Sequence, residues 1–222
     1  MRKMLLALLL MGSLAFAIAP VESWTLGGTG KYTQTPAAGY VTEGGNVTNL
    51  NLTGNVSTEK WAGYWGNVSG LIVLAPAAGA PLFYSWIWNS GNGGEVCAVA
   101  AASGFDWSTV QAVTGPEIDV VWNFLGADTD SADNTLSGAC TMNVAGTLVT
   151  TSEGVTTNGG AFQTCPVADQ AVPAAKTDIA FCVNIAQNGA LFNSQTGDYQ
   201  LLTAANQTLG ATETHYFWIE LD

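Results

Sequence analysis

Basic residues are scarce in this sequence. Lys and Arg number 5 against 17 Asp and Glu, which gives a formal net charge of −12 over 222 residues. Because Arg2 and Lys3 are two of the five, the chain from residue 18 onward has three lysines against seventeen acids, a net charge of −14. A surface this acidic repels phosphate backbones and anionic lipids. The charge balance argues against nucleic-acid and membrane-surface binding and makes divalent cations the natural counter-ions.

Histidine and the common catalytic motifs are also lacking. His215 is the only histidine, and the sequence has neither G-x-S-x-G nor H-E-x-x-H. Ser-His-Asp and Cys-His catalysis need a base beside the nucleophile, whereas His215 falls in an aromatic, strand-like run. Glycosidases need two facing carboxylates, but no pair stands out; Glu95 and Glu153 merely lie beside glycines. We therefore expect no enzymatic activity, with a secreted hydrolase as the third choice of function.

Apolar runs of membrane-spanning length are absent as well. The apolar run of residues 4–11 follows Arg2 and Lys3 and precedes the small-residue pattern Ala15-Phe16-Ala17. This order is typical of a secretory signal peptide, and the run is too short to span a bilayer. We predict a signal peptide over residues 1–17, and hence an extracellular or cell-surface protein without a membrane span after cleavage. A pilin-type signal that keeps its apolar helix is the alternative.

Cysteines are few, and none of them forms a C-x-x-C pair. An even number in an exported protein predicts disulfides, and four cysteines allow three pairings. We favour Cys97–Cys182 and Cys140–Cys165, because Cys97 and Cys182 both lie in apolar, strand-like runs. The missing C-x-x-C argues against a zinc knuckle or a redox pair, and no cofactor is expected apart from a possible calcium ion.

The residues that are abundant indicate a β protein. Apolar residues make up 48%, charged residues only 10%, and glycines number 26. Strand-like patterns with turn signals between them cover residues 70–75, 82–88, 95–100, 141–150, 177–185, 198–203 and 213–221. We predict an all-β, jelly-roll-like β-sandwich with one short inserted α-helix at about residues 116–125. Residues 18–40 are expected to form an extended N-terminal arm, and residues 41–222 a single β-sandwich domain.

The predicted helix has recognisable ends. Thr114 suits the N-cap, and Pro116 and Glu117 suit the first turn. Gly126 is a typical C-terminal stop, so the apolar face is expected to reach Leu125.

Asparagines with the N-x-S/T pattern are concentrated early in the chain. The pattern predicts N-glycosylation in an exported protein, and it begins at Asn46, Asn51, Asn55, Asn67 and Asn206. Around these sites Leu50 and Leu52 alternate with Asn49 and Asn51. Period-2 alternation predicts a strand that points its leucines into a core and its asparagines to solvent.

A row of large side chains lies on one face of the predicted strand 82–88. It consists of Leu82, Tyr84, Trp86 and Trp88. We interpret this row as core, with stacking on sugar rings or on a neighbouring subunit as the alternative.

One acidic cluster is dense enough to suggest a cation site. It comprises Asp128, Asp130, Asp133 and Asn134, and closely spaced oxygen ligands suit calcium. An EF-hand loop is excluded, because its required positions are occupied by Ala132, Asp133 and Ala139. The alternatives are a solvated acidic loop and a calcium site of another geometry.

The run from Trp61 to Gly70, together with the later echoes Asp106-Trp107 and Tyr216-Phe217-Trp218, resembles a family of secreted archaeal proteins. Their motif has the form W-x-G-(Y/F)-(Y/W)-G-N-(V/I)-(S/T)-G. The family has no assigned activity, so the resemblance implies a cell-surface location and no catalytic residue. Members carry a cysteine where this chain has Ala112, so their disulfide pattern is not carried over.

We interpret Trp61 to Gly70 as a strand-turn-strand corner, with Tyr64 and Trp65 closing the end of the sandwich and Asn67 in solvent. The predicted function is an exported, N-glycosylated structural protein of an extracellular filament, sheath or surface layer. Its expected partners are further copies of itself or other surface proteins, joined by strand addition of the N-terminal arm. The alternative is an extracellular carbohydrate-binding or adhesion module.

Overall fold

The structure is a computed structural model that describes residues 18–33, 39–208 and 210–222. It consists of antiparallel sheets, with 36% of residues in strands and 8% in helices. The predicted fold class, an all-β sandwich with one short inserted helix, is confirmed. The expected signal peptide, residues 1–17, lies outside the described residues. No helix in the described part of the chain is long and apolar enough to cross a membrane.

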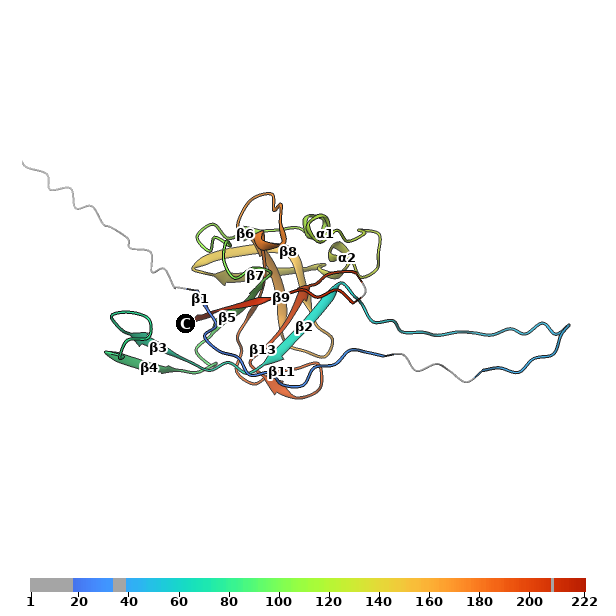
Figure 1. Cartoon of the computed structure of the whole chain (residues 1–222), viewed down its shortest axis with the longest axis horizontal. Coiled ribbons are helices and arrows are strands. Elements are labelled where there is room, and N and C mark those ends of the chain that lie inside the picture. The colour runs from blue at the N-terminus through green and yellow to red at the C-terminus, as the bar shows by residue number, and fades with distance from the viewer. Residues whose placement is uncertain (1–17, 34–38, 209) are drawn as a thin grey trace, which may run out of the picture.

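The main sheet joins strands from distant parts of the chain (Figure 1). Its order is β1 (Ala19–Pro20), β14 (Tyr216–Leu221), β5 (Gly94–Val99), β10 (Ile179–Asn184), β9 (Gln163–Ala168), β8 (Thr147–Thr156) and β7 (Gly138–Val144), with β6 (Gln111–Ala112) also on β9. The smaller pairs are β2 (Trp61–Gly66) with β13 (Tyr199–Ala204), β3 (Gly70–Leu74) with β4 (Tyr84–Trp88), and β11 (Gly189–Ala190) with β12 (Thr196–Gly197). The helices are α1 (Gly115–Trp122), the four-residue α2 (Ala132–Thr135) and a 3-10 turn at Lys176–Asp178.

The central strands β5, β9 and β10 are buried on both faces. Side chains alternate across a strand, so neighbouring residues of β10 enter different cores. Phe181 faces the first core, where it contacts Trp122 of α1 and Trp61 of β2. Cys182 faces the second core, which the β7–β8 hairpin covers. The sandwich thus has a layer on each face of its central strands.

Two disulfides lie in the second core. Cys97 on β5 bonds Cys182 on β10, with their Cα atoms 4.1 Å apart. Cys140 on β7 bonds Cys165 on β9, with their Cα atoms 6.0 Å apart. This is the pairing favoured from the sequence. The second bond holds the β7–β8 hairpin over the central strands.

Helix α1 begins as predicted but ends early. The Glu117 carboxylate accepts hydrogen bonds from the backbone N–H and the hydroxyl of Thr114, both at 2.8 Å. Asn123 adopts a left-handed conformation with φ of 57° and caps the helix there. Leu125 therefore lies beyond the helix and is exposed, which corrects its assignment to the apolar face.

Three strand predictions need correction. Residues 141–150 are not one strand but the end of β7, a turn and the start of β8, and in the turn Ala145 and Gly146 have positive φ values of 50° and 74°. Strand β9 was missed. The strand expected around Leu50 and Leu52 does not form, and both leucines are exposed.

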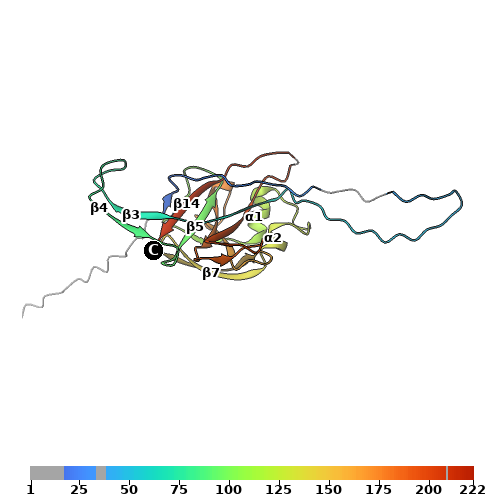
Figure 2. The same cartoon turned by 90° about the horizontal axis from the view of Figure 1, so that it is seen from below.

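Two segments project from opposite ends of the sandwich (Figures 1 and 2). One is an arm made of the described residues 22–33 and 39–59, which reverses at a turn where the Asn46 N–H bonds the Glu43 carbonyl and returns to β2. The other is the β3–β4 hairpin. The arm differs from the predicted one: residues 18–21 lie along the protein's own β14, and the extended segment continues to residue 59 rather than 40.

Candidate functional site

The motif from Trp61 to Gly70 forms β2 and the corner that leads into β3. Trp61 is partly buried and packs against the first core, with its ring 6.2 Å from those of Phe124 and Phe181. Tyr64 packs edge-on against Phe217 at 4.9 Å. Trp65 is half exposed, so it does not close the end of the sandwich as expected.

Asp198 holds the corner. Its carboxylate accepts hydrogen bonds from the N–H groups of Val68 at 3.0 Å and Asn188 at 3.3 Å. Its own N–H donates to the Gly66 carbonyl at 2.8 Å. The chain therefore leaves the sandwich at Asn67, which is exposed. The predicted strand-turn-strand corner is present.

The predicted glycosylation sites cluster on one projection. Three of them, Asn46, Asn51 and Asn55, lie on the arm and are exposed, as is Asn67 at the corner. Asn206 is half-buried, and its side-chain oxygen accepts the Thr208 N–H at 3.0 Å.

The β3–β4 hairpin is not core, which corrects the main interpretation of its aromatic row. Only Trp88, at the base of the hairpin, is buried, with 3% exposure. Tyr84 and Trp86 are half exposed, and Phe83 and Ile87 are exposed by 82% and 86%. Alternation shows which side chains of a strand share a face, but it does not show whether another layer covers that face. No further layer of the described chain covers the aromatic face of this hairpin.

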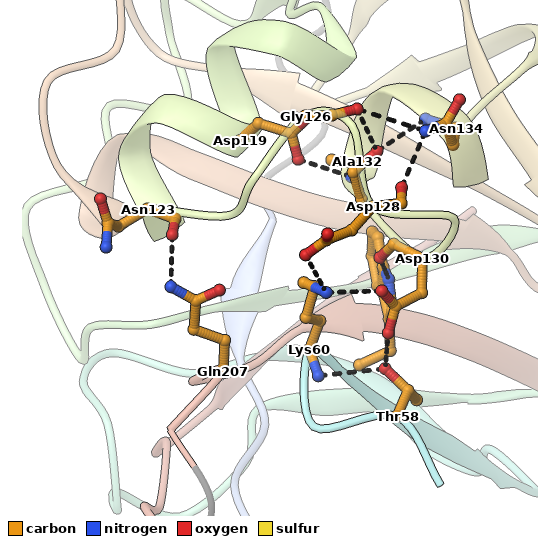
Figure 3. Close-up of polar contacts among 12 residues, drawn as sticks. Thr58, Lys60, Asp119, Asn123, Gly126, Asp128, Asp130, Ala132, Asn134 and Gln207 are labelled. Carbon is orange, nitrogen blue, oxygen red and sulfur yellow. Dashed lines mark hydrogen bonds and ion pairs between the residues drawn. The ribbon is translucent and has the colours of Figure 1, made fainter. Parts of the chain in front are cut away.

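The acidic cluster is organised around a lysine side chain (Figure 3). The Lys60 ammonium lies 2.9 Å from Asp128 and 2.5 Å from Asp130. Asp130 also accepts the Thr58 hydroxyl at 2.7 Å, and its carbonyl accepts the Trp61 indole N–H at 2.8 Å. We call these five residues the Lys60 junction.

Charge complementarity stabilises the Lys60 junction. Burial lowers the pKa of Lys60, but the hydrogen bonds and charges of Asp130 and Asp128 outweigh burial and raise it. At Asp130, burial raises the pKa, but the contacts with Lys60 and Thr58 outweigh burial and lower it. The junction therefore stays charged over a wide pH range and fastens the end of the arm to the loop between α1 and α2.

The other two predicted calcium ligands point elsewhere. Asp133 is exposed on α2. The Asn134 amide nitrogen donates to the carbonyls of Gly126 at 3.2 Å and Asp128 at 2.8 Å (Figure 3). Within residues 18–33, 39–208 and 210–222, no three His, Cys, Asp or Glu side chains gather as a metal site. Calcium binding stays a prediction.

A hollow of about 480 Å³ lies between the base of the arm and β2. Two carboxylates reach it, and each is paired: Glu59 with Lys31 and Glu213 with Lys176, both at 2.5 Å. His215 also lines it, with its Nε2 donating to the Ala204 carbonyl at 3.0 Å. This leaves Nδ1 to accept the Tyr64 hydroxyl at 3.0 Å. Burial lowers the pKa of His215, so the ring is neutral near pH 7 and acts as a structural bridge.

A buried acidic pair was missed from the sequence. Glu95 on β5 lies directly opposite Glu220 on β14, and both are buried. The Ala145 N–H donates to Glu220 at 2.8 Å and to Glu95 at 3.3 Å. Burial, followed by Glu220, raises the pKa of Glu95 to about 9. The sequence feature that could have indicated this pair is the position of each glutamate inside an apolar, strand-like run.

No protein-family model, curated protein or solved structure matches this chain. The resemblance to secreted archaeal surface proteins stays a prediction. The described features that lack an explanation within the single chain are the apolar hairpin and the arm.

Proposed function

We propose that this protein is an exported structural subunit of the cell surface that associates with further copies of itself in a filament, sheath or surface layer. The two disulfides suit an oxidising, extracellular environment. The exposed N-x-S/T sites on the arm suit a glycosylated surface protein.

The observation that carries this proposal is the exposed apolar hairpin. Large side chains are exposed on both of its faces: Leu71, Ile72, Val73, Leu74, Leu82, Phe83, Tyr84, Trp86 and Ile87. Their exposed surface, divided between the two faces, is on the order of 1,000 Å² in total, whereas the largest contiguous apolar patch on a monomer usually covers a few hundred Å². Each partner in a stable interface contributes about 800 Å². A single copy in solution would leave this apolar area exposed to water. We therefore infer that a permanent partner covers it.

The test is the mass and shape of the exported protein over a range of concentrations. Light scattering after size exclusion is expected to show masses above 23.0 kDa for the unmodified chain, and negative-stain microscopy to show ordered polymers. Deleting residues 22–56 is expected to reduce assembly. Monomers alone at every concentration, in material taken from the cell surface, would contradict the proposal.

Carbohydrate binding is the second candidate, because Tyr84 and Trp86 lie together on one face of β4. Their rings are 4.8 Å apart, and both are half exposed. Exposed aromatic rings of this kind stack on sugars. Glycan-array binding that Trp86→Ala or Trp65→Ala abolishes, with an unchanged melting temperature, would favour this function over self-association.

A further inference from the structure

The β3–β4 hairpin has the properties of an acceptor for another strand. β3 and β4 pair only with each other in the described chain, so each has an unpaired edge. Residues 61–94, which include the whole hairpin, contain no charged side chain. Charges and prolines along an edge normally prevent strand addition, and neither strand contains either.

The returning limb of the arm has the properties of a donor strand. Over residues 48–56, Leu50, Leu52 and Val56 have one parity and are exposed. Asn51 and Asn55, which begin N-x-S/T triplets, have the other parity. A segment with this alternation is suited to a half-buried strand, yet it belongs to no strand of its own chain. Glycans on Asn51 and Asn55 would remain on the solvent face of such a strand.

Donor and acceptor lie at opposite ends of the long axis of the molecule (Figures 1 and 2). A contact between two different surfaces of identical subunits is heterologous, and it propagates into an open filament when the rotation does not close. The net charge of −14 after residue 17 disfavours an anionic membrane as the occupant of the hairpin.

We propose that residues 48–56 of one copy add as an edge strand to the β3–β4 hairpin of the next copy. Leu50, Leu52 and Val56 then extend the apolar face that Tyr84 and Trp86 form. This inference rests on the proposed self-association and names the two surfaces that carry it. Backbone hydrogen bonds along the edge provide the affinity, and the alternating side chains provide the register.

The test uses paired variants of the full exported chain. Leu52→Lys places a charge on the apolar face of the donor, and Asn49→Lys places it on the polar face as the control. Trp86→Lys and Ser85→Lys are the corresponding pair on opposite faces of β4. Leu52→Lys and Trp86→Lys are expected to raise the concentration needed for assembly by about tenfold or more. Both controls are expected to assemble like the wild type, and circular dichroism checks that all four variants fold.

Mixing the two defective variants identifies the partners. Leu52→Lys keeps an intact acceptor and Trp86→Lys an intact donor, so an equimolar mixture is expected to form dimers and no longer species in sedimentation velocity. Dimers formed by Leu52→Lys alone would indicate a hairpin–hairpin contact and overturn the inference.

Other outcomes separate the two proposals. Normal polymers from Trp86→Lys would overturn this inference and leave self-association standing. Wild-type protein that is monomeric throughout would overturn both. Monomers that sediment with phosphatidylcholine vesicles, and fail to do so with Trp86→Lys, would assign the hairpin to a membrane instead.

Discussion

Glu95 and Glu220 are two buried acidic residues that lie opposite each other on neighbouring strands. Two buried carboxylates opposite each other cannot both be ionised without a large cost. The pKa of Glu95, raised to about 9, keeps this group protonated at neutral pH. Its proton allows a hydrogen bond to the Glu220 side chain. The buried Oε1 atom of Glu220 has no hydrogen-bond partner among the described residues.

This pair contributes more to the stability of the fold in acid than in base. The folded pKa of Glu95 lies above the ordinary value of 4.5, so its contribution to stability is complete below about pH 4.5 and is lost as the pH rises through 9. Burial, with a smaller contribution from Glu220, also raises the pKa of Asp222, which acts in the same direction. Glu95→Gln stays neutral and is expected to stabilise the fold at pH 8 by a few kcal/mol, on the order set by linkage.

Thermal melts at pH 5 and pH 8 measure this effect. The melting temperature of Glu95→Gln should exceed that of the wild type by more at pH 8 than at pH 5. Glu43→Gln, at an exposed position on the arm, is the matched control and should follow the wild type. Equal pH dependence in Glu95→Gln and the wild type would refute the prediction.

The N-x-S/T sites are expected to differ in occupancy. Asn46, Asn51, Asn55 and Asn67 are exposed, whereas Asn206 is half-buried and its side-chain oxygen is hydrogen-bonded. A modifying enzyme must reach the amide, so glycopeptide mass spectrometry of the exported protein should find sugar on the four exposed sites and least on Asn206. Full occupancy at Asn206 alone would contradict this order.

At the scale of elements, the Lys60 junction connects β2 to the loop between the two helices. The Lys60 side chain is only 11% exposed, whereas its partners Asp128 and Asp130 are about 40% exposed. Removing one member of a buried ion pair leaves the other uncompensated. The junction should therefore contribute more than the surface pair of Lys31 and Glu59.

Lys60→Met is expected to lower the free energy of unfolding by about 2 kcal/mol, because two acids lose their counter-charge. Lys31→Met, the control, should cost less than about 1 kcal/mol, as exposed pairs do. Urea unfolding measures both changes in the free energy of unfolding. Equal changes would show that the Lys60 junction contributes no more to stability than the surface pair does.

Adding EDTA to the wild type tests the calcium alternative: a lower melting temperature would support a bound cation, and an unchanged one would oppose it.

At the scale of the whole molecule, the few cations hold parts of the chain together. Each lysine after residue 17 is paired: Lys31 with Glu59, Lys60 with Asp128 and Asp130, and Lys176 with Glu213. The remaining acids leave the surface strongly negative, with a sequence pI of about 4.1. The hairpin, which has no charge, is the exception.

Self-association should therefore strengthen with salt. Copies with a net charge of −14 repel one another, and raising NaCl from about 0.02 M to about 0.3 M shortens the range of that repulsion. Sedimentation velocity should show more assembly at the higher salt concentration, while Trp86→Lys should assemble less than the wild type in both. Assembly that weakens with salt would instead indicate contacts between opposite charges.

Local patterns were enough to predict several elements. Thr114, Pro116 and Glu117 indicated the start of α1, because capping depends on adjacent residues. The strand predicted over residues 213–221 is present as β14, where Phe217 packs against the first core and Trp218 against the second. The apolar surroundings of Cys97 and Cys182 pointed to the observed pairing. Composition indicated an all-β fold.

Only the tertiary structure decided which faces are covered. Trp86 and Trp88 share a parity, yet Trp88 is buried and Trp86 is exposed, because the covering layer comes from distant strands and reaches only the base of the hairpin. Cys182 has Cys97 on one neighbouring strand and Cys165 on the other, and the position of Cys140 completes the choice of partners. A period of two specifies a face, whereas burial depends on what folds against that face.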